Sequence, residues 1–302
     1  MFQKDLISIH DLAASDVAVL FSLAARMKAS PKDFRTALSG KILAMIFEKS
    51  STRTRVSFEA GMTQLGGAAQ FLSARDIQIG RGEPISDTAR VLSRYVDGIM
   101  ARTFAHDTVV QLARHATIPI INGLTDLLHP CQALTDYFTM SEKFGALQGL
   151  RLAYVGDGNN MAHSLMYGGP KCGVHVAVAT PPGYEPDATV TANARADAAA
   201  AGTTLLVTHS REEAVAGAHV VYTDVWPRWA RRPSSRSACA TSRAGPSRTT
   251  SSPSRTSEPS SCTASRRTAA RKCRPACATA PVRSSSTRRR TASTSRRRSS
   301  PR

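Results

Sequence analysis

A short polar turn between an apolar strand and a helix constrains this chain more than any other stretch. Residues 41–47 (KILAMIF) form an apolar run of strand length. Apolar residues then recur at helical spacing from Val56 to Leu65, where Gly66-Gly67 ends the pattern. A buried strand therefore feeds a helix through the polar residues 50–54, which is the connection expected in an α/β fold.

The composition of this turn favours an anion. The first turn of a helix leaves backbone N–H groups unpaired and carries the positive end of the helix dipole. The turn also holds hydroxyls and arginines, at Ser51, Thr52, Arg53 and Thr54, and a guanidinium matches the oxygens of a phosphate. A capped helix with solvated arginines is the commoner interpretation of a lone S-T-R motif. Here the polar groups fill one helical turn after a buried strand, so the sequence predicts a phosphate site.

Strand-like and helix-like segments alternate along the rest of the folded part. We predict strands at 41–47, 69–72, 98–102, 118–121, 151–157, 175–179, 205–208 and 220–222. Helices are predicted at 87–96, 107–115, 133–143, 190–201 and 211–216, after a first helix capped by Ser15 and ending near Ser30-Pro31. The predicted fold class is α/β, with two doubly wound parallel-sheet domains at residues 1–132 and 133–226.

Three further motifs follow predicted strands. Arg102 ends the strand 98–102, and the carboxyl ends of parallel strands are where ligands gather. The next strand leads to His129-Pro130-Cys131-Gln132, although a lone His-Pro pair more often only fixes a loop. The strand from residue 151 ends in Asp157-Gly158-Asn159-Asn160, where a dinucleotide loop is the alternative. That alternative lacks the G-x-G-x-x-G spacing and an acidic residue at the next strand end.

These motifs together resemble the aspartate and ornithine carbamoyltransferases. The run 51–55 (STRTR) is similar to the family's carbamoyl-phosphate signature, and residues 223–226 (TDVW) are similar to its T-D-x-W run. Residues 56–59 (VSFE) and the H-P-C-Q and D-G-N-N runs lean towards its ornithine branch. The resemblance covers residues 1–226 almost continuously. It implies that carbamoyl phosphate is bound by Ser51, Thr52, Arg53, Thr54, Arg102, His129 and Gln132, with Arg102 and His129 catalytic, and that ornithine is bound by Asn160 and Asp224.

The resemblance also implies an activity. A carbamoyl group would pass from carbamoyl phosphate to the side-chain amine of ornithine, giving citrulline and phosphate, without a metal or organic cofactor. Such an enzyme would serve arginine biosynthesis or a catabolic arginine pathway, as a homotrimer or larger homo-oligomer. The N-acetylornithine, putrescine and aspartate carbamoyltransferases remain alternatives, although Cys131 and the D-G-N-N run argue against the aspartate branch.

The charge of the chain is unevenly distributed. The formal net charge is +18, yet residues 227–302 hold 20 of the 40 Lys and Arg residues and a single acidic residue, Glu258. Residues 1–226 therefore carry 20 basic and 21 acidic residues and are nearly neutral. After Trp229 the only large aliphatic residue is Val282, which predicts a tail without a core, disordered in isolation. A basic arm on a catalytically dead scaffold that binds polyanions is the non-enzyme alternative.

The abrupt change after Trp226 suggests a shift of reading frame. Pro227-Arg228-Trp229-Ala230 can be encoded as CCN-CGN-TGG-GCN, and regrouping one base earlier can then spell Ala-Ser-Met-Gly, which the family has at this point. The same shift lets residues 262–273 encode the family's H-C-L-P run and residues 284–297 its closing helix. We therefore predict that one base is missing near the Trp226 codon and that the chain as written is inactive.

The cysteines and the N-terminus indicate a location. Four of the six cysteines lie in the tail without the paired spacings of a zinc site, which leaves Cys131 and Cys172 for the folded part. No signal peptide or membrane span is predicted. We expect a cytoplasmic protein with no membrane partner and no specific nucleic-acid partner.

Overall fold

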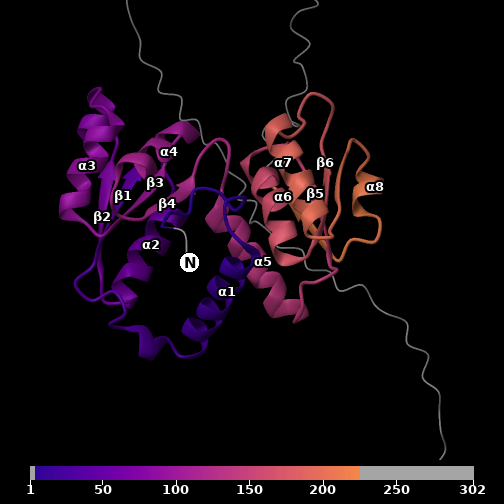
Figure 1. The fold of residues 1–302 in the computed structure, drawn as a ribbon, viewed down its shortest axis with the longest axis horizontal. Coiled ribbons are helices and arrows are strands. Elements are labelled where there is room, and N and C mark those ends of the chain that lie inside the picture. Colours follow the sequence, from indigo (N-terminus) through magenta and orange to yellow (C-terminus); the bar gives the residue numbers. More distant parts are fainter. Residues whose placement is uncertain (1–3, 225–302) are drawn as a thin grey trace, which may run out of the picture. The chain divides into compact units, whose positions relative to one another are not determined.

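The computed structural model describes residues 4–224, which form two four-stranded parallel sheets. The strand order is β2-β1-β3-β4 in the first sheet and β7-β6-β5-β8 in the second (Figure 1). The α/β prediction with two doubly wound sheets is confirmed. The predicted disordered tail, residues 227–302, lies outside the described residues.

The first sheet lies in the N-terminal part of the chain, whose first and last helices pack into the apolar cluster of the second sheet. In chain order the elements are α1 (Ala14–Ala29), η1 (Pro31–Phe34), β1 (Ile42–Phe47), α2 (Thr52–Gln64), β2 (Ala68–Ser73), η2 (Gln78–Arg81), α3 (Ile85–Tyr95), β3 (Gly98–Arg102), α4 (His106–His115), β4 (Ile120–Leu124) and α5 (Pro130–Phe144).

The second sheet follows with the same alternation. Its elements are β5 (Arg151–Val155), α6 (Asn160–Cys172), β6 (His175–Ala179), α7 (Ala188–Ala200), β7 (Leu205–Thr208), α8 (Arg211–Val215) and β8 (Val220–Thr223). The helix α6, which is buried along most of its length, was not predicted from the sequence.

Burial explains why these runs become parallel strands. Five of the six residues of β1 are buried, as are four of the five residues of β3, because helices cover both faces of the sheet. Parallel crossovers are right-handed, so the strand order puts α3 and α4 together on one face of the first sheet and α2 on the other. Side chains of β1 and β3 pack into separate apolar clusters on these two faces.

The structure corrects several predicted boundaries. The first helix is capped at Ala13, whose N–H donates to Asp16 Oδ2 over 3.1 Å, so Ser15 is not its N-cap. The strand β4 runs to Leu124 because Asn122, predicted to lie in the loop, is fully buried and pairs with β3. Pro130 starts α5 three residues before the predicted position, since proline suits the first turn of a helix.

Within residues 4–224 no helix is long and apolar enough to cross a bilayer.

Candidate active site

The predicted phosphate turn lies at the start of α2. Ser51 is the N-cap: its Oγ accepts a hydrogen bond from the Thr54 N–H over 3.2 Å and donates to Thr54 Oγ1 over 3.0 Å. The amides of Thr52 and Arg53 have no acceptor within the helix because they belong to its first turn. Both of these side chains are exposed. The turn therefore presents N–H groups and a cation to solvent, as an anion site requires.

Arg102 reaches the same turn from the neighbouring strand. It ends β3 directly beside Phe47, the last residue of β1, and its Nη1 donates to Thr54 Oγ1 over 3.3 Å. Its Nε is buried and has no hydrogen-bond partner among the described residues. Burial lowers the pKa of this guanidinium, which still stays charged at neutral pH. A half-buried cation with a buried, unpaired N–H is a strong site for an anionic or carbonyl oxygen.

His129 approaches the turn from α5, of which it is the N-cap residue. Its backbone N–H donates to Ser164 Oγ over 2.7 Å, and its ring Nδ1 is buried without a partner in the described part of the chain. Burial, and then the charge of Arg102, lowers the pKa of this imidazole to about 4, while Asp224 opposes the shift. The ring is therefore neutral at pH 7 and offers one donor and one acceptor.

Gln132 lies on the first turn of α5 but points to a neighbour that the sequence did not single out. Its Nε2 donates to Asp136 Oδ1 over 3.0 Å. Burial raises the pKa of the Asp136 carboxyl to about 6, against the hydrogen bonds from Gln132 and Tyr222. The i, i+4 spacing of these two residues on a helix is the signal that could have identified the pair.

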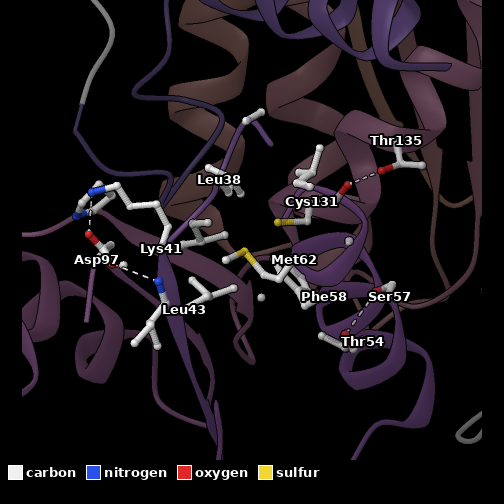
Figure 2. A pocket seen from close by; sticks show the side chains of 18 of the residues that line it. Leu38, Lys41, Leu43, Thr54, Ser57, Phe58, Met62, Asp97, Cys131 and Thr135 are labelled. Atoms are coloured by element: carbon white, nitrogen blue, oxygen red, sulfur yellow. Dashed lines mark hydrogen bonds and ion pairs between the residues drawn. The ribbon is translucent and has the colours of Figure 1, made fainter. Parts of the chain in front are cut away.

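A cavity of about 880 Å³ brings part of the predicted site together (Figure 2). Arg53, Thr54, His129 and Gln132 line it. The rest of its wall is mostly apolar and lies between α2 and α5 over the first sheet, and Figure 2 shows Leu38, Leu43, Phe58 and Met62 among the lining side chains. Lys41 and Asp97 also line the cavity but are paired with each other, so we assign only the end with Arg53, Thr54, His129 and Gln132 to chemistry.

A second cavity, of about 600 Å³, lies on the other side of the turn. Ser51 and Thr52 line it together with Glu48, Arg55 and Arg75. Arg55 forms an ion pair with Glu59 and lies 3.9 Å from the centre of the Phe71 ring. The four predicted phosphate ligands therefore divide between two adjoining cavities rather than facing one.

The predicted amino-acid end is built around the start of α6. Asn160 is the first residue of this helix, and its Nδ2 donates to Thr125 O over 2.6 Å. The preceding Asn159 caps the helix through Oδ1 and donates from Nδ2 to Asp224 Oδ2 over 3.0 Å. Asp224 follows β8, which pairs with β5, so the two strand ends bring these groups together. The sequence singled out Asn160 and Asp224, whereas the structure joins Asp224 to Asn159.

Close packing explains the glycine of the D-G-N-N run. A Cβ on Gly158 would lie 2.2 Å from Pro186 N and 2.4 Å from Glu185 C, so no larger residue fits without moving that loop. The Gly158 N–H also donates to Tyr184 O over 2.8 Å. This contact fixes the turn that starts α6, which in turn places Asn159 and Asn160.

No group of three or more His, Cys, Asp or Glu side chains within residues 4–224 is placed to hold a metal ion.

The fold defines an α/β protein with two parallel-sheet domains. Two family models match the chain: the aspartate/ornithine carbamoyltransferase carbamoyl-P binding domain over residues 4–142, and the Asp/Orn binding domain of the same family over residues 148–239. The chain belongs to the aspartate/ornithine carbamoyltransferase family.

Named relatives agree with this assignment. The chain is 58% identical over 225 residues to an ornithine carbamoyltransferase of Anoxybacillus flavithermus, a match that covers 74% of this chain and 72% of the relative. It is 53% identical over 225 residues to one from Thermococcus kodakarensis, covering 74% and 71%. Among solved structures, the ornithine carbamoyltransferase of Pyrococcus furiosus is similar with a TM-score of 0.72 and 52% identity, covering 75% of this chain and 73% of that one.

Proposed function

We propose that the protein's sequence is that of an ornithine carbamoyltransferase, which transfers the carbamoyl group of carbamoyl phosphate to the side-chain amine of ornithine. The observation that carries the proposal is the 52–58% identity to relatives of that name across the whole described fold. The site described above supports it with chemistry at the expected positions.

The phosphate end holds positive charge and hydrogen-bond donors where negative charge develops on the departing phosphate. As the C–O bond of carbamoyl phosphate breaks, its electron pair goes to the departing phosphate. The amides and hydroxyls of the turn 51–54 and the guanidinium of Arg53 stabilise this growing charge. Because these groups are in place before the substrate arrives, little reorganisation opposes the reaction.

The carbamoyl carbon is attacked by the neutral amine of ornithine. Electrons of the C=O bond move to the oxygen, which is stabilised by the Arg102 guanidinium and by a ring N–H of the neutral His129. The intermediate then expels phosphate. The ornithine nitrogen, which carries an extra proton once it has bonded to the carbamoyl carbon, loses that proton to solvent or phosphate. Gln132 would hold the carbamoyl amide after exchanging its contact with Asp136.

The amino-acid end orients the second substrate. Asn160 and Asp224 would bind the α-amino-acid group of ornithine, so that its side-chain amine points to the carbamoyl carbon. Most of the rate gain would come from positioning and electrostatic stabilisation. The proposed division is a carbamoyl-phosphate domain at 1–132 and an ornithine domain at 133–226, supported by the names of the two family models. A cytoplasmic homotrimer or larger homo-oligomer in arginine metabolism belongs to the same proposal.

We further propose that a base is missing near the Trp226 codon. The alignments with the relatives cover about three quarters of each chain, although the second family model continues to residue 239. The resemblance implies a closing helix that packs across both domains, and the apolar part of the larger cavity is a surface such a helix would cover.

The decisive experiment compares this chain with a frame-restored chain, in which one base is inserted after the Trp226 codon. Both are purified and assayed for citrulline formed from ornithine and carbamoyl phosphate. We expect activity from the frame-restored chain only. Citrulline from the unrepaired chain would overturn the frame proposal, and activity from neither would overturn the proposed function. Comparable efficiency with putrescine, N-acetylornithine or aspartate would move the protein to another branch of the family.

A further inference from the structure

Three residues on one face of α6 hold the loop that carries His129. Asn160 Nδ2 donates to Thr125 O over 2.6 Å, His163 Nδ1 lies 2.8 Å from Leu127 O, and Ser164 Oγ accepts from the His129 N–H over 2.7 Å. The three helical residues are spaced i, i+3 and i+4 and so share a face. Their partners are alternate residues of the loop 125–129, which is thus fastened along its whole length.

His163 is the middle fastening, and its partners determine its protonation state. The side chain is buried, with 5% exposure. Leu127 O can only accept, so Nδ1 must carry the proton, while Nε2 accepts from the Asp187 N–H over 2.9 Å and must be bare. The ring is therefore neutral and fixed in its Nδ1–H tautomer. Burial lowers the pKa of this imidazole, in agreement with a neutral ring, although Leu127 O and Asp187 act to raise it.

The loop also closes on itself, so a shift at Leu127 reaches His129 directly. The Thr125 N–H donates to Leu128 O over 2.8 Å, and the Leu128 N–H donates to Thr125 Oγ1 over 3.0 Å. The other side of this turn, Leu127–His129, is held by the hydrogen bonds from His163 to Leu127 O and from the His129 N–H to Ser164. His129 and Thr54 both line the larger cavity, and the charge of Arg102, which donates to Thr54 Oγ1, acts on the His129 ring.

We propose that His163 is a positioning residue for the carbamoyl transfer: through Leu127 it fixes the loop that aims the His129 ring, and through α6 it ties that loop to Asn160 at the amino-acid end. This inference rests on the proposed function. A ligand that moves Asn160 would move the helix turn holding His129, so the two ends of the site act as one unit. His163 itself touches neither substrate.

Two substitutions separate the two bonds of His163. Nδ1 is two bonds from Cβ, as is the amide nitrogen of asparagine, while Nε2 is three bonds away, as is the side-chain oxygen of glutamine. His163→Asn therefore keeps a donor for Leu127 O and loses the bond to Asp187. His163→Gln keeps an acceptor for Asp187 and loses the loop bond. Each variant removes one hydrogen bond to a backbone group, Leu127 O or the Asp187 N–H, so each is the matched control for the other.

Kinetics of the two variants are measured in the frame-restored chain. We expect His163→Gln to lower kcat at least about tenfold with KM for carbamoyl phosphate little changed, since a misplacement of about 1 Å can cost about 100-fold. His163→Asn should remain within about threefold of the parent. Equal losses in the two variants would overturn the proposal, because a structural role alone does not distinguish the two nitrogens.

A second measurement uses the chain as it exists and needs no activity. Nitrogen-15 NMR of the histidine rings should show His163 protonated at Nδ1 and bare at Nε2 at pH 7. Amide exchange at His129 should be about fivefold faster in His163→Gln than in His163→Asn, which equals about 1 kcal/mol, the net worth of one hydrogen bond. An Nε2–H tautomer or equal exchange would overturn the proposal. If the frame-restored parent makes no citrulline, the proposed function fails while these two readouts still decide the positioning role.

Discussion

The two ends of the proposed site differ in how far their polar groups are already paired. At the phosphate end, Arg102 Nε and His129 Nδ1 are buried without partners among the described residues, and the helix turn presents open amides. At the amino-acid end, Asn159 and Asn160 are both hydrogen-bonded within the chain, and Asp224 accepts from the former. Asp157 Oδ1 is the exception, buried there without a partner in residues 4–224.

This difference indicates how each substrate binds. An oxygen that reaches the phosphate end satisfies groups that are otherwise unpaired, so binding there needs no internal bond to break. An amino acid that binds at the other end must replace hydrogen bonds that Asn159 and Asn160 already make within the chain, unless residues after 224 provide its ligands. Under the proposed function we therefore expect the carbamoyl-phosphate side to be preorganised and the ornithine side to rearrange when its substrate binds.

Removing Arg102 should have the largest effect. In the frame-restored chain, Arg102→Ala takes away the cation beside the carbamoyl oxygen, and we expect kcat to fall by about 100-fold to 1000-fold. Arg90→Ala, which removes an exposed arginine paired with Asp87, is the control and should be neutral. Steady-state kinetics with both substrates would test this. A kcat within threefold of the parent would remove Arg102 from the proposed site.

Removing Arg53 should have a smaller effect of a different kind. This exposed guanidinium is expected to contact phosphate in the bound and transition states, so Arg53→Ala should weaken carbamoyl-phosphate binding and slow turnover. The loss should be at least about 1.5–3 kcal/mol, the range for hydrogen bonds to a charged group. Calorimetric titration with carbamoyl phosphate and steady-state kinetics would measure it. Near-normal constants would contradict the prediction that the helix turn binds phosphate.

Local sequence patterns predicted the phosphate end better than the amino-acid end. Ser51, Thr54 and Arg102 follow adjacent parallel strands, so strand order alone brings them to one edge of the sheet. The partner of Asp224 could not be predicted in this way. Whether Asn159 or Asn160 faces it depends on where α6 begins, and that is set by the packing of Gly158 against another loop.

The fold itself followed closely from hydrophobic runs. The strands 98–102, 175–179 and 205–208 are confirmed at their predicted bounds. The helix α6 was missed because it is buried on most of its surface and so lacks the alternation of polar and apolar faces that indicates a helix. Missing α6 also concealed Asn160, His163 and Ser164 as a set, since their common face is visible only once the helix is known.

Replacing the two neighbouring asparagines separates structure from binding at the amino-acid end. Asn159→Ala removes the cap of α6 and the contact with Asp224, so the free energy of unfolding should fall by about 1–2 kcal/mol. Asn160→Ala leaves the cap intact but removes the hydrogen bond to Thr125 O, so it should also cost about 1 kcal/mol of stability and, unlike Asn159→Ala, should raise the KM for ornithine. Urea unfolding and steady-state kinetics of both variants would compare them. An unchanged KM for ornithine in Asn160→Ala would contradict this division of roles.

The smallest expected effect concerns pH, where two residues on α5 act in opposite directions. The pKa of His129 is lowered to about 4, so its neutral form is favoured by folding. Its contribution to stability is complete above the unfolded value of about 6.5 and is lost as the pH falls towards 4. The pKa of Asp136 is raised to about 6, so its charged form opposes folding. That penalty disappears as the pH falls below 6.

Between pH 6.5 and 5 the two effects should largely cancel, each amounting to about 1 kcal/mol after allowance for partial exposure. Relative to the parent, His129→Gln should gain stability as the pH falls, because only the Asp136 effect remains. Asp136→Asn should lose stability over the same range, because only the His129 effect remains. Urea unfolding at pH 7.0, 6.0 and 5.0 would measure both differences in the free energy of unfolding. Groups that titrate alike in all three proteins do not contribute to these differences. Parallel pH profiles for the three proteins would show that burial shifts the pKa of neither group. They would also remove the argument that His129 acts as a neutral donor at the phosphate end of the site.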